Sequence, residues 1–279
     1  MTSQRLPAES ASIQSVERAL DILFLLADAK SPLTVGQIAE QLGVHNSTAS
    51  RLLSTLAQQN VVVQSRDGYR LGLGLLRLTH VVLNELNIRT VANPHLRRLC
   101  QETGHVIYLA TLFEGDELYL DQIDTEESAS KTSWIGRTIP AHTASGGKVL
   151  LAHLDDEAIA AYLERDLISS TRQTITAPEH LLAQLSAIRE RGYAISQDEY
   201  LLGFSNVAAP IFDRSRKNIA VVALSGPTTQ LPLERLNELA SQVVTTASAI
   251  SIELGYTLNG KGKIPNESRR SSTYRLTHH

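Results

Sequence analysis

Cysteine is nearly absent from this sequence, since Cys100 is the only one. A single thiol can form neither an internal disulfide nor a multi-cysteine zinc site, which is typical of a protein of the reducing cytosol. Aromatic residues are also scarce, at 5% with one tryptophan, and this excludes a broad stacking platform for single-stranded nucleic acid. No stretch approaches the roughly 20 apolar residues that span a bilayer, and the polar residues 1–15 lack the apolar run of a secretory signal. We therefore expect a soluble, cytoplasmic protein without a membrane partner.

An excess of positive charge, the usual sign of a nucleic-acid-binding protein, is missing too. The net charge is −3, and the first ninety residues carry eight basic and seven acidic side chains, a net charge of +1. Overall charge therefore leaves DNA binding undecided, and a few well-placed cations would have to provide it. The length of 279 residues and the 42% hydrophobic content predict about two domains with ordinary cores.

Three helices are predicted in the first sixty residues. In Ser15–Ala27, apolar side chains recur at three- and four-residue spacing and predict one buried face, made of Val16, Ala19, Leu20, Leu23 and Leu26. Thr34 and Gln37 form the S/T-x-x-E/Q capping box of a second helix, and Gly43 ends that helix because glycine adopts the left-handed conformation without steric cost. The third helix has Asn46 or Ser47 as its N-cap and directs Ala49, Leu52, Leu53 and Leu56 inward.

Two short helices joined by a tight glycine-containing turn are typical of a helix-turn-helix, whose second helix can enter the major groove of DNA. The β-prone runs Val61–Gln64 and Tyr69–Leu71 flank an Asp-Gly pair, which favours a hairpin with a tight primed turn. A helix-turn-helix followed by a hairpin is a winged helix. Its DNA-binding residues are predicted to be His45, Asn46, Ser47, Thr48, Ser50 and Arg51 in and just before the third helix, and Arg66 and Arg70 on the wing. The alternative is a small three-helix unit with an ordinary solvated face.

Several of these segments resemble one family, the IclR-type bacterial transcription regulators. In the first ninety residues the resemblance rests on Val16–Leu23, Ile38-Ala39, Leu42-Gly43, Ser47-Thr48, Arg51–Leu53, Leu56 and Tyr69–Gly72. Further along it rests on Gly136-Arg137, Pro140, His142, Ala144–Lys148, Gly192–Ala194, Glu199, Gly203, Ala208–Pro210, Ala223–Pro227 and Leu254–Tyr256. The fragments follow the family's order over residues 13–257. One departure is Gly146-Gly147, where the family more often has another small residue before the second glycine.

The sequence patterns and the resemblance together predict an α+β chain with a winged helix-turn-helix at 11–72, a linker helix at 73–90 and a GAF-like effector domain with a mostly antiparallel sheet at 91–257. The tail at 258–279 is polar and lacks periodicity, which predicts disorder. In the linker, leucines at near-heptad steps predict a buried helix, either against a second subunit or against its own domain. We expect a homodimer, which suits two half-sites on DNA, and a tetramer is left open.

The second domain is predicted from alternating strands and helices. Strands are expected at 105–113, 117–123, 207–212 and 219–224, and helices at 147–153, 155–167, 178–191 and 232–254. The resemblance implies a cavity for a small organic or aromatic acid, lined by Ile139, Ser145, Gly146, Ser196, Asn206 and Ser225. Backbone N–H groups where the helix after Ala144 begins would suit the carboxylate. For Ile139 the alternative is a core role, and for Asn206 and Ser225 hydrogen bonds within the sheet or a turn.

An enzyme built on the second domain is the rival function. The sequence has no G-x-S-x-G elbow, phosphate-binding loop or H-E-x-x-H, and Gly72 and Gly74 lack the third glycine of a dinucleotide fingerprint. Asp198 and Glu199 are interpreted as lid-closing or helix-capping groups, and Cys100 as a core residue. We therefore expect no catalytic residues, metal or cofactor. The expected function is ligand-controlled binding to operator DNA, for a catabolic operon according to the resemblance.

Overall fold

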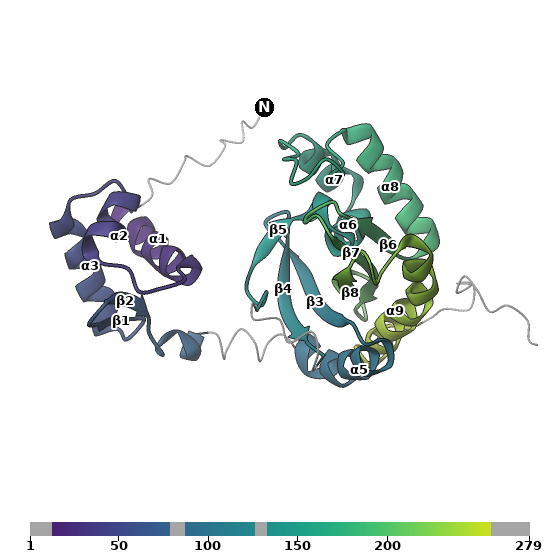
Figure 1. The fold of residues 1–279 in the computed structure, drawn as a ribbon, viewed down its shortest axis with the longest axis horizontal. Coiled ribbons are helices and arrows are strands. Elements are labelled where there is room, and N and C mark those ends of the chain that lie inside the picture. Colours follow the sequence, from purple (N-terminus) through teal and green to yellow (C-terminus); the bar gives the residue numbers. More distant parts are fainter. Residues whose placement is uncertain (1–12, 79–86, 126–132, 258–279) are drawn as a thin grey trace, which may run out of the picture. The chain divides into compact units, whose positions relative to one another are not determined.

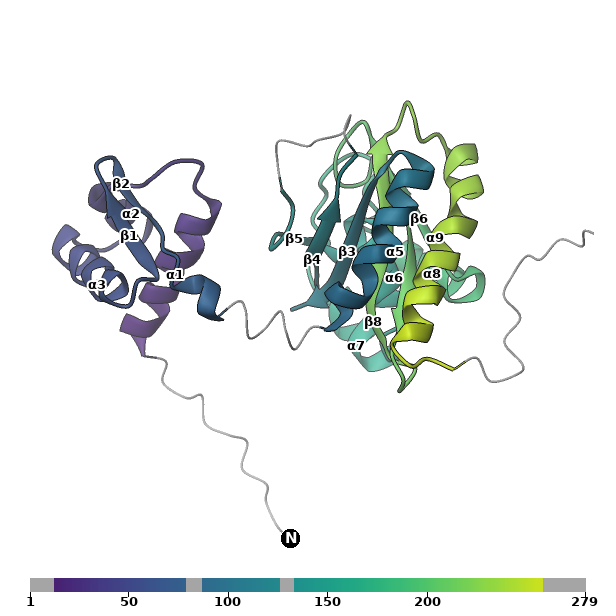
Figure 2. The same cartoon turned by 90° about the horizontal axis from the view of Figure 1, so that it is seen from below.

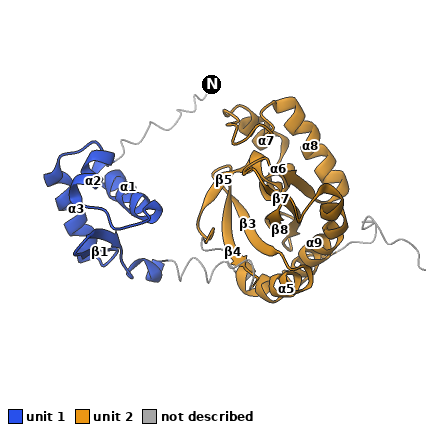
Figure 3. Ribbon diagram, viewed as in Figure 1, with its two compact units in different colours: residues 1–86 blue, residues 87–279 orange. Residues whose placement is uncertain are grey.

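The computed structural model describes residues 13–78, 87–125 and 133–257. Its contacts divide the chain into two compact units, residues 1–86 and 87–279 (Figure 3). The tail expected to be disordered, 258–279, lies outside the described residues.

The first unit is a winged helix-turn-helix (Figure 1). It contains α1 (Gln14–Asp28), α2 (Val35–Gln41), α3 (Asn46–Gln58) and the hairpin of β1 (Val62–Ser65) and β2 (Gly68–Leu71). The predicted capping box is confirmed, because the Thr34 hydroxyl accepts from the Gln37 N–H while the Gln37 side chain accepts from the Thr34 N–H. Gly43 after α2 has φ +62°, the left-handed conformation that ends the helix.

Two local predictions for the helices are wrong. On α1, Ile22 and Leu26 are buried, whereas Val16 and Leu20 are 52% and 49% exposed. The helix is apolar on two sides, so spacing alone could not tell which side faces its own core. Helix α3 begins at Asn46 with His45 at the N-cap position and no side-chain cap, so neither Asn46 nor Ser47 caps it.

The hairpin forms as expected, but its turn differs. Ser65 pairs with Gly68, so the two turn residues are Arg66 and Asp67, and neither has the positive φ of a primed turn. Gly68 has the unusual backbone, with φ +137°, and a Cβ there would lie 2.6 Å from the Leu33 carbonyl oxygen. The glycine therefore lets the chain before α2 pack against the wing.

The linker is described only at its two ends. Residues 75–78 are helical and α5 (Asn87–Thr103) begins after residue 86, while 79–86 lie outside the described residues. Leu73, Leu76 and Leu78 are exposed within the single chain. Among the described residues these three leucines do not pack against the first unit, and the burial of the linker helix stays a prediction.

The second unit is built on one six-stranded sheet with the order β5-β4-β3-β8-β7-β6, in which every neighbouring pair is antiparallel. The strands are β3 (Val106–Phe113), β4 (Asp116–Ile123), β5 (Thr138–Pro140), β6 (Ala194–Gln197), β7 (Phe204–Phe212) and β8 (Asn218–Pro227). The helices after α5 are α6 (Ser145–Ala152), α7 (Asp156–Leu163), α8 (Pro178–Arg191) and α9 (Leu233–Glu253), and a 3₁₀ turn, η1 (Ala141–Thr143), precedes α6. The predicted mixed α+β fold with a mostly antiparallel sheet is confirmed; β5 and β6 were not predicted.

Helices cover both faces of the sheet. Helices α5 and α9 lie on one face, and α6 lies on the other with α8 packed against it (Figure 2). Small residues on β3, β7 and β8, among them Ala110, Ala208 and Ala223, let α6 pack close to the sheet. A side chain at Gly147 would collide with the backbone of Ala141, so glycine there lets α6 pack against η1. This close packing fixes the start of α6 above the sheet.

Candidate functional site

Helix α3 exposes a row of polar side chains in the first unit. Ala49 and Leu53 are buried against α1 and α2, which leaves the opposite side of the helix to solvent. Of the six residues predicted on this helix, Thr48 is half-buried and the others are exposed: His45, Asn46, Ser47, Ser50 and Arg51. Their contacts with DNA stay predictions.

The wing adds two exposed cations. Arg66 lies in the turn between β1 and β2, and Arg70 lies on β2 opposite Val63. Side chains alternate along a strand, so Tyr69 packs on the core of the unit while Arg70 points away from it. The first unit therefore combines a polar helix with a basic hairpin.

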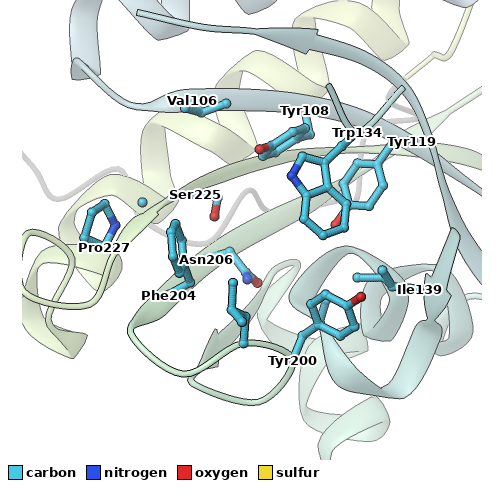
Figure 4. A pocket seen from close by; sticks show the side chains of 13 residues that line it. Val106, Tyr108, Tyr119, Trp134, Ile139, Tyr200, Phe204, Asn206, Ser225 and Pro227 are labelled. Carbon is cyan, nitrogen blue, oxygen red and sulfur yellow. The ribbon is translucent and has the colours of Figure 1, made fainter. Parts of the chain in front are cut away.

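A cavity of about 490 Å³ lies in the second unit, on the α6 side of the sheet. It is lined by Val106, Tyr108, Tyr119, Trp134, Ile139, Ala144, Tyr200, Leu201, Phe204, Asn206, Ser225, Gly226 and Pro227. Ring centroids lie 5.1 Å apart for Tyr108 and Tyr119, 5.6 Å for Tyr119 and Trp134, and 6.0 Å for Trp134 and Tyr200. Figure 4 shows these rings around the cavity, with Asn206 and Ser225 among them. The size and the apolar lining with few polar groups are typical of a small-molecule site.

The sheet register brings the polar residues together. Asn206 on β7 pairs with Ser225 on β8, which in turn pairs with Val106 on β3. Tyr108 and Tyr119 come from β3 and β4, and Tyr200 and Leu201 from the loop between β6 and β7. Segments far apart in the sequence, from Val106 to Pro227, therefore meet at one end of the sheet, beside the start of α6.

The inner end of the cavity is the start of α6. The Asn206 side-chain oxygen accepts from the Ser145 N–H at 3.0 Å, and the Glu117 carboxylate accepts from the Gly147 N–H at 2.7 Å. A smaller pocket of about 20 Å³ lies here, lined by Tyr108, Glu117, Tyr119, Ala144, Ser145, Gly146, Asn206, Ala223 and Ser225. Glu117 is only 1% exposed, and its burial raises the pKa of the carboxyl to about 7, although the Gly147 N–H acts to lower it. Burial also raises the pKa of Tyr119.

Five of the six residues predicted to bind the effector lie around this space. Ile139, Asn206 and Ser225 line the larger cavity, and Ser145 and Gly146 line the inner pocket. Ser196 pairs with Asn206 across the sheet but lines neither space, and its hydroxyl donates to the Thr143 carbonyl at 3.5 Å. Whether any of the six binds an effector stays a prediction.

Sequence reasoning missed Glu117 and the aromatic lining. The aromatic residues Tyr108, Tyr119, Trp134, Tyr200 and Phe204 are few and widely spaced, so no local motif marked them. Tyr108 and Tyr119 did lie within the predicted strands 105–113 and 117–123, close to their centres. The apolar alternation of those strands was the one available signal.

A buried ion pair holds the loop that covers the cavity. Lys148 on α6 is fully buried, and its Nζ lies 2.6 and 2.7 Å from the two carboxylate oxygens of Glu199 and 3.0 Å from the Gln184 side-chain oxygen. Burial lowers the pKa of Lys148 and raises that of Glu199, while the mutual attraction of the two charges opposes both shifts. Because Tyr200 and Leu201 follow Glu199 directly, the pair fixes where these two residues meet the cavity.

The remaining candidate side chains have structural partners. His142 is buried, with its ring nitrogens 2.9 Å from the Tyr162 hydroxyl and 3.1 Å from the Ile168 carbonyl oxygen. Cys100 is buried in α5, as predicted. Among the described residues no three His, Cys, Asp or Glu side chains gather as metal ligands do. Within the same ranges no helix is both long and apolar enough to cross a membrane.

Comparison with known proteins identifies both units. Residues 15–66 match the IclR helix-turn-helix domain, and residues 80–252 match the bacterial transcriptional regulator IclR C-terminal domain. The chain is 30% identical over 251 residues to the transcriptional repressor IclR of Escherichia coli, covering 88% of this chain and 92% of the repressor.

Solved structures agree with this match. The crystal structure of Thermotoga maritima IclR has a TM-score of 0.71 and 29% identity, covering 87% of this chain and 99% of that one. An IclR homologue from Microbacterium hydrocarbonoxydans, complexed with 4-hydroxybenzoate, has the same fold with a TM-score of 0.75 and 24% identity, covering 86% and 98%. The chain belongs to the IclR family of bacterial transcriptional regulators, with a DNA-binding helix-turn-helix domain and an effector-binding C-terminal domain.

Proposed function

We propose that this chain binds operator DNA with an affinity set by a small aromatic effector held in the cavity of the second unit. The observation that carries the proposal is the lining of that cavity by the rings of Tyr108, Tyr119, Trp134 and Tyr200. Aromatic rings stack edge-to-face with one another and with a planar ligand, and each such contact contributes about 0.5–1.5 kcal/mol. The homologue complexed with 4-hydroxybenzoate supports the same ligand class. Small aromatic acids are the first compounds to test, and a catabolic operon for such compounds is the proposed target.

On the DNA side, α3 is proposed to enter the major groove with its N-terminal polar residues at the base edges. Arg51 would contact a phosphate or a guanine, and Arg66 and Arg70 would hold the flanking backbone. The exposure of these residues and the near-neutral charge of the first ninety residues support base contacts from α3 and backbone contacts from the wing. Because few cations are available, each one should matter for affinity.

We propose a cytoplasmic homodimer as the DNA-binding form. On α1 the exposed apolar side chains Ile13, Val16, Leu20 and Phe24 follow one another at three- and four-residue steps, so they share one face of the helix. Leu73, Leu76 and Leu78 are exposed as well. An apolar face of this kind in a soluble regulator is typical of a protein interface, and a second copy would bring two recognition helices to two half-sites.

The test is a mobility-shift titration with the DNA upstream of the protein's own gene. It is run with unlabelled competitor DNA and with a panel of phenols, benzoates and aliphatic acids. A specific shift whose midpoint moves with an aromatic compound supports the proposal. A specific shift that responds only to an aliphatic acid would overturn the aromatic class and keep the regulator. Absence of any specific shift, there and along a library of genomic fragments, would contradict sequence-specific binding.

Effector binding is measured separately from DNA binding. Trp134 is the only tryptophan of the chain and lines the cavity, so its fluorescence reports a ligand there. An aromatic compound that changes this fluorescence but not the mobility shift would contradict effector control of operator affinity.

A further inference from the structure

The start of α6 is already occupied by two side chains of the protein. The first N–H groups of a helix lack intrahelical partners and favour a negative charge. Here the Glu117 carboxylate accepts from Gly147 and the Asn206 amide oxygen accepts from Ser145. The sequence had suggested that an effector carboxylate would take this place. Two of its donors are instead taken up by side chains from β4 and β7.

Close packing keeps Glu117 in this position. It lies on β4, opposite Ile139 of β5, and is 1% exposed. A side chain at Gly146 would collide with the Glu117 carboxylate, so the acid lies flush against the helix backbone. A ligand carboxylate entering the same end would have to approach this buried acid directly, and whenever Glu117 is ionised the two like charges repel each other strongly in the desolvated site.

A second polar group at this end has no partner. The Ser145 side chain is fully buried, and among the described residues its hydroxyl forms no hydrogen bond. Buried hydroxyls are nearly always paired, because an unpaired one forfeits its hydration. Ser145 lines the inner pocket together with Glu117, so both groups face the same small space.

The size of that space limits what can enter it. At about 20 Å³ it is only slightly larger than the roughly 10–15 Å³ that a water molecule needs. One oxygen atom fits, whereas a carboxylate brings three non-hydrogen atoms. A hydroxyl can donate to a carboxylate and accept from a serine hydroxyl at the same time, which complements both Glu117 and Ser145.

We propose that the effector presents an uncharged hydroxyl, rather than a carboxylate, at the start of α6, where Glu117 accepts its hydrogen bond and Ser145 donates one to it. The inference rests on the proposed function, since it assumes that the aromatic cavity binds the effector. It adds the chemical group that the inner end selects. An aromatic acid binds here with its hydroxyl inward, and an aromatic acid without a hydroxyl is a poor ligand.

The test uses 4-hydroxybenzoate, 4-methoxybenzoate and benzoate as matched probes, with dissociation constants from Trp134 fluorescence and calorimetry. The parent chain is expected to bind the hydroxy compound at least about tenfold more tightly than the other two, since one satisfied buried hydrogen bond changes affinity by about that factor. Equal affinities for the three would overturn the hydroxyl inference while leaving the aromatic effector in place. Failure of all three, and of phenol, to bind would overturn this inference together with the proposed aromatic effector.

Two variants separate ligand recognition from folding. In Glu117→Gln the amide oxygen can still accept from Gly147, but the NH₂ group then faces the pocket as a donor. The preference for 4-hydroxybenzoate over 4-methoxybenzoate should fall by about tenfold or invert.

Ser145→Ala removes the unpartnered hydroxyl with little change in side-chain volume. It should weaken the binding of the hydroxy compound alone, by about three- to tenfold. Both variants are checked by thermal unfolding, and an unchanged preference in two folded variants would overturn the proposal. If the parent binds 4-hydroxybenzoate tightly and both variants keep the same preference for it, the proposal is wrong. An ordered water, and not the ligand hydroxyl, would then pair with Glu117.

Discussion

At the scale of single residues, the DNA-binding proposal depends most on Arg51, the only cation on α3. Arg51→Ala should weaken operator binding by about 1–3 kcal/mol, roughly 5- to 150-fold, because a lost arginine contact to a base or phosphate has this magnitude. Effector binding, followed by Trp134 fluorescence, should not change. Lys30→Ala is the matched control, since it removes an exposed cation outside α3 and the wing. Equal operator affinity for the Arg51 variant and the parent in mobility shifts would contradict the assignment.

Glu117 predicts a pH dependence of stability. Its pKa is about 7 in the folded chain and 4.5 when solvated, so between these values the folded state binds the proton more tightly. The free energy of unfolding of the second unit should therefore fall as the pH rises from about 5 to about 8, by on the order of 3 kcal/mol. Urea denaturation followed by Trp134 fluorescence at several pH values measures this.

The matched variants isolate the carboxyl. Glu117→Gln cannot titrate, so its stability should change less over this range and exceed that of the parent at pH 8. Glu114→Gln, in the exposed turn between β3 and β4, should keep the parent's slope. A parent slope that survives in Glu117→Gln would show that another group titrates.

The sequence predicted residues that act within one turn of the chain better than residues that act across the sheet. Thr34 and Gln37 were predicted because their partners lie three residues away. Glu117 was not, because its partner Gly147 lies 30 residues further along and an acid in an alternating strand is ordinarily a solvated position. Ser196 differs from the other five predicted effector residues, since it lines neither space and its hydroxyl donates to the Thr143 carbonyl.

At the scale of secondary-structure elements, the buried pair between α6 and the β6–β7 loop controls the edge of the cavity. Lys148→Met would leave Glu199 buried without its counter-charge, which typically costs about 3–5 kcal/mol of stability. The same change should loosen Tyr200 and Leu201 and weaken binding of an aromatic ligand. The double variant Lys148→Met with Glu199→Met should recover much of the stability, because no buried charge remains. Urea denaturation of the parent, Lys148→Met and the double variant gives their free energies of unfolding. A double variant less stable than Lys148→Met would contradict the argument.

The sequence predicted long helices and strands with one clear apolar periodicity well, and it predicted short strands and the orientation of a helix that is apolar on two sides poorly. Helices α6, α8 and α9 and strands β3 and β4 begin and end within two residues of their predicted bounds. The short edge strands β5 and β6 were missed, since three or four residues give too few alternations to recognise. For α1 the helix was predicted correctly, and so was the inward position of Leu23 and Leu26, but Val16 and Leu20 on the predicted buried face are exposed. Val16, Leu20 and Phe24 on its other side are exposed in the described part of the chain.

At the scale of the whole molecule, that uncovered side of α1 predicts the oligomeric state. Leu20→Glu places a charge in the middle of the exposed apolar face and should convert a dimer into monomers without unfolding the chain, since the side chain is half-exposed in isolation. Ser15→Glu, on another side of the same helix, is the matched control and should leave the dimer intact. Sedimentation velocity at several concentrations measures the change. A monomeric parent, or a dimeric Leu20 variant, would contradict the proposed interface.

Effector control also makes a reciprocal prediction. If an effector changes the operator dissociation constant by a given factor, operator DNA must change the effector dissociation constant by the same factor, because both describe one coupling free energy. We expect a factor of about 5–150, corresponding to about 1–3 kcal/mol. Trp134 reports effector binding with and without operator DNA, and mobility shifts report operator binding with and without effector. At DNA concentrations that saturate the parent but not Arg51→Ala, DNA should no longer change the effector dissociation constant of the variant. Two unequal factors for the parent would mean that a further species, such as a second oligomer, takes part, and a factor of one in both directions would remove effector control altogether.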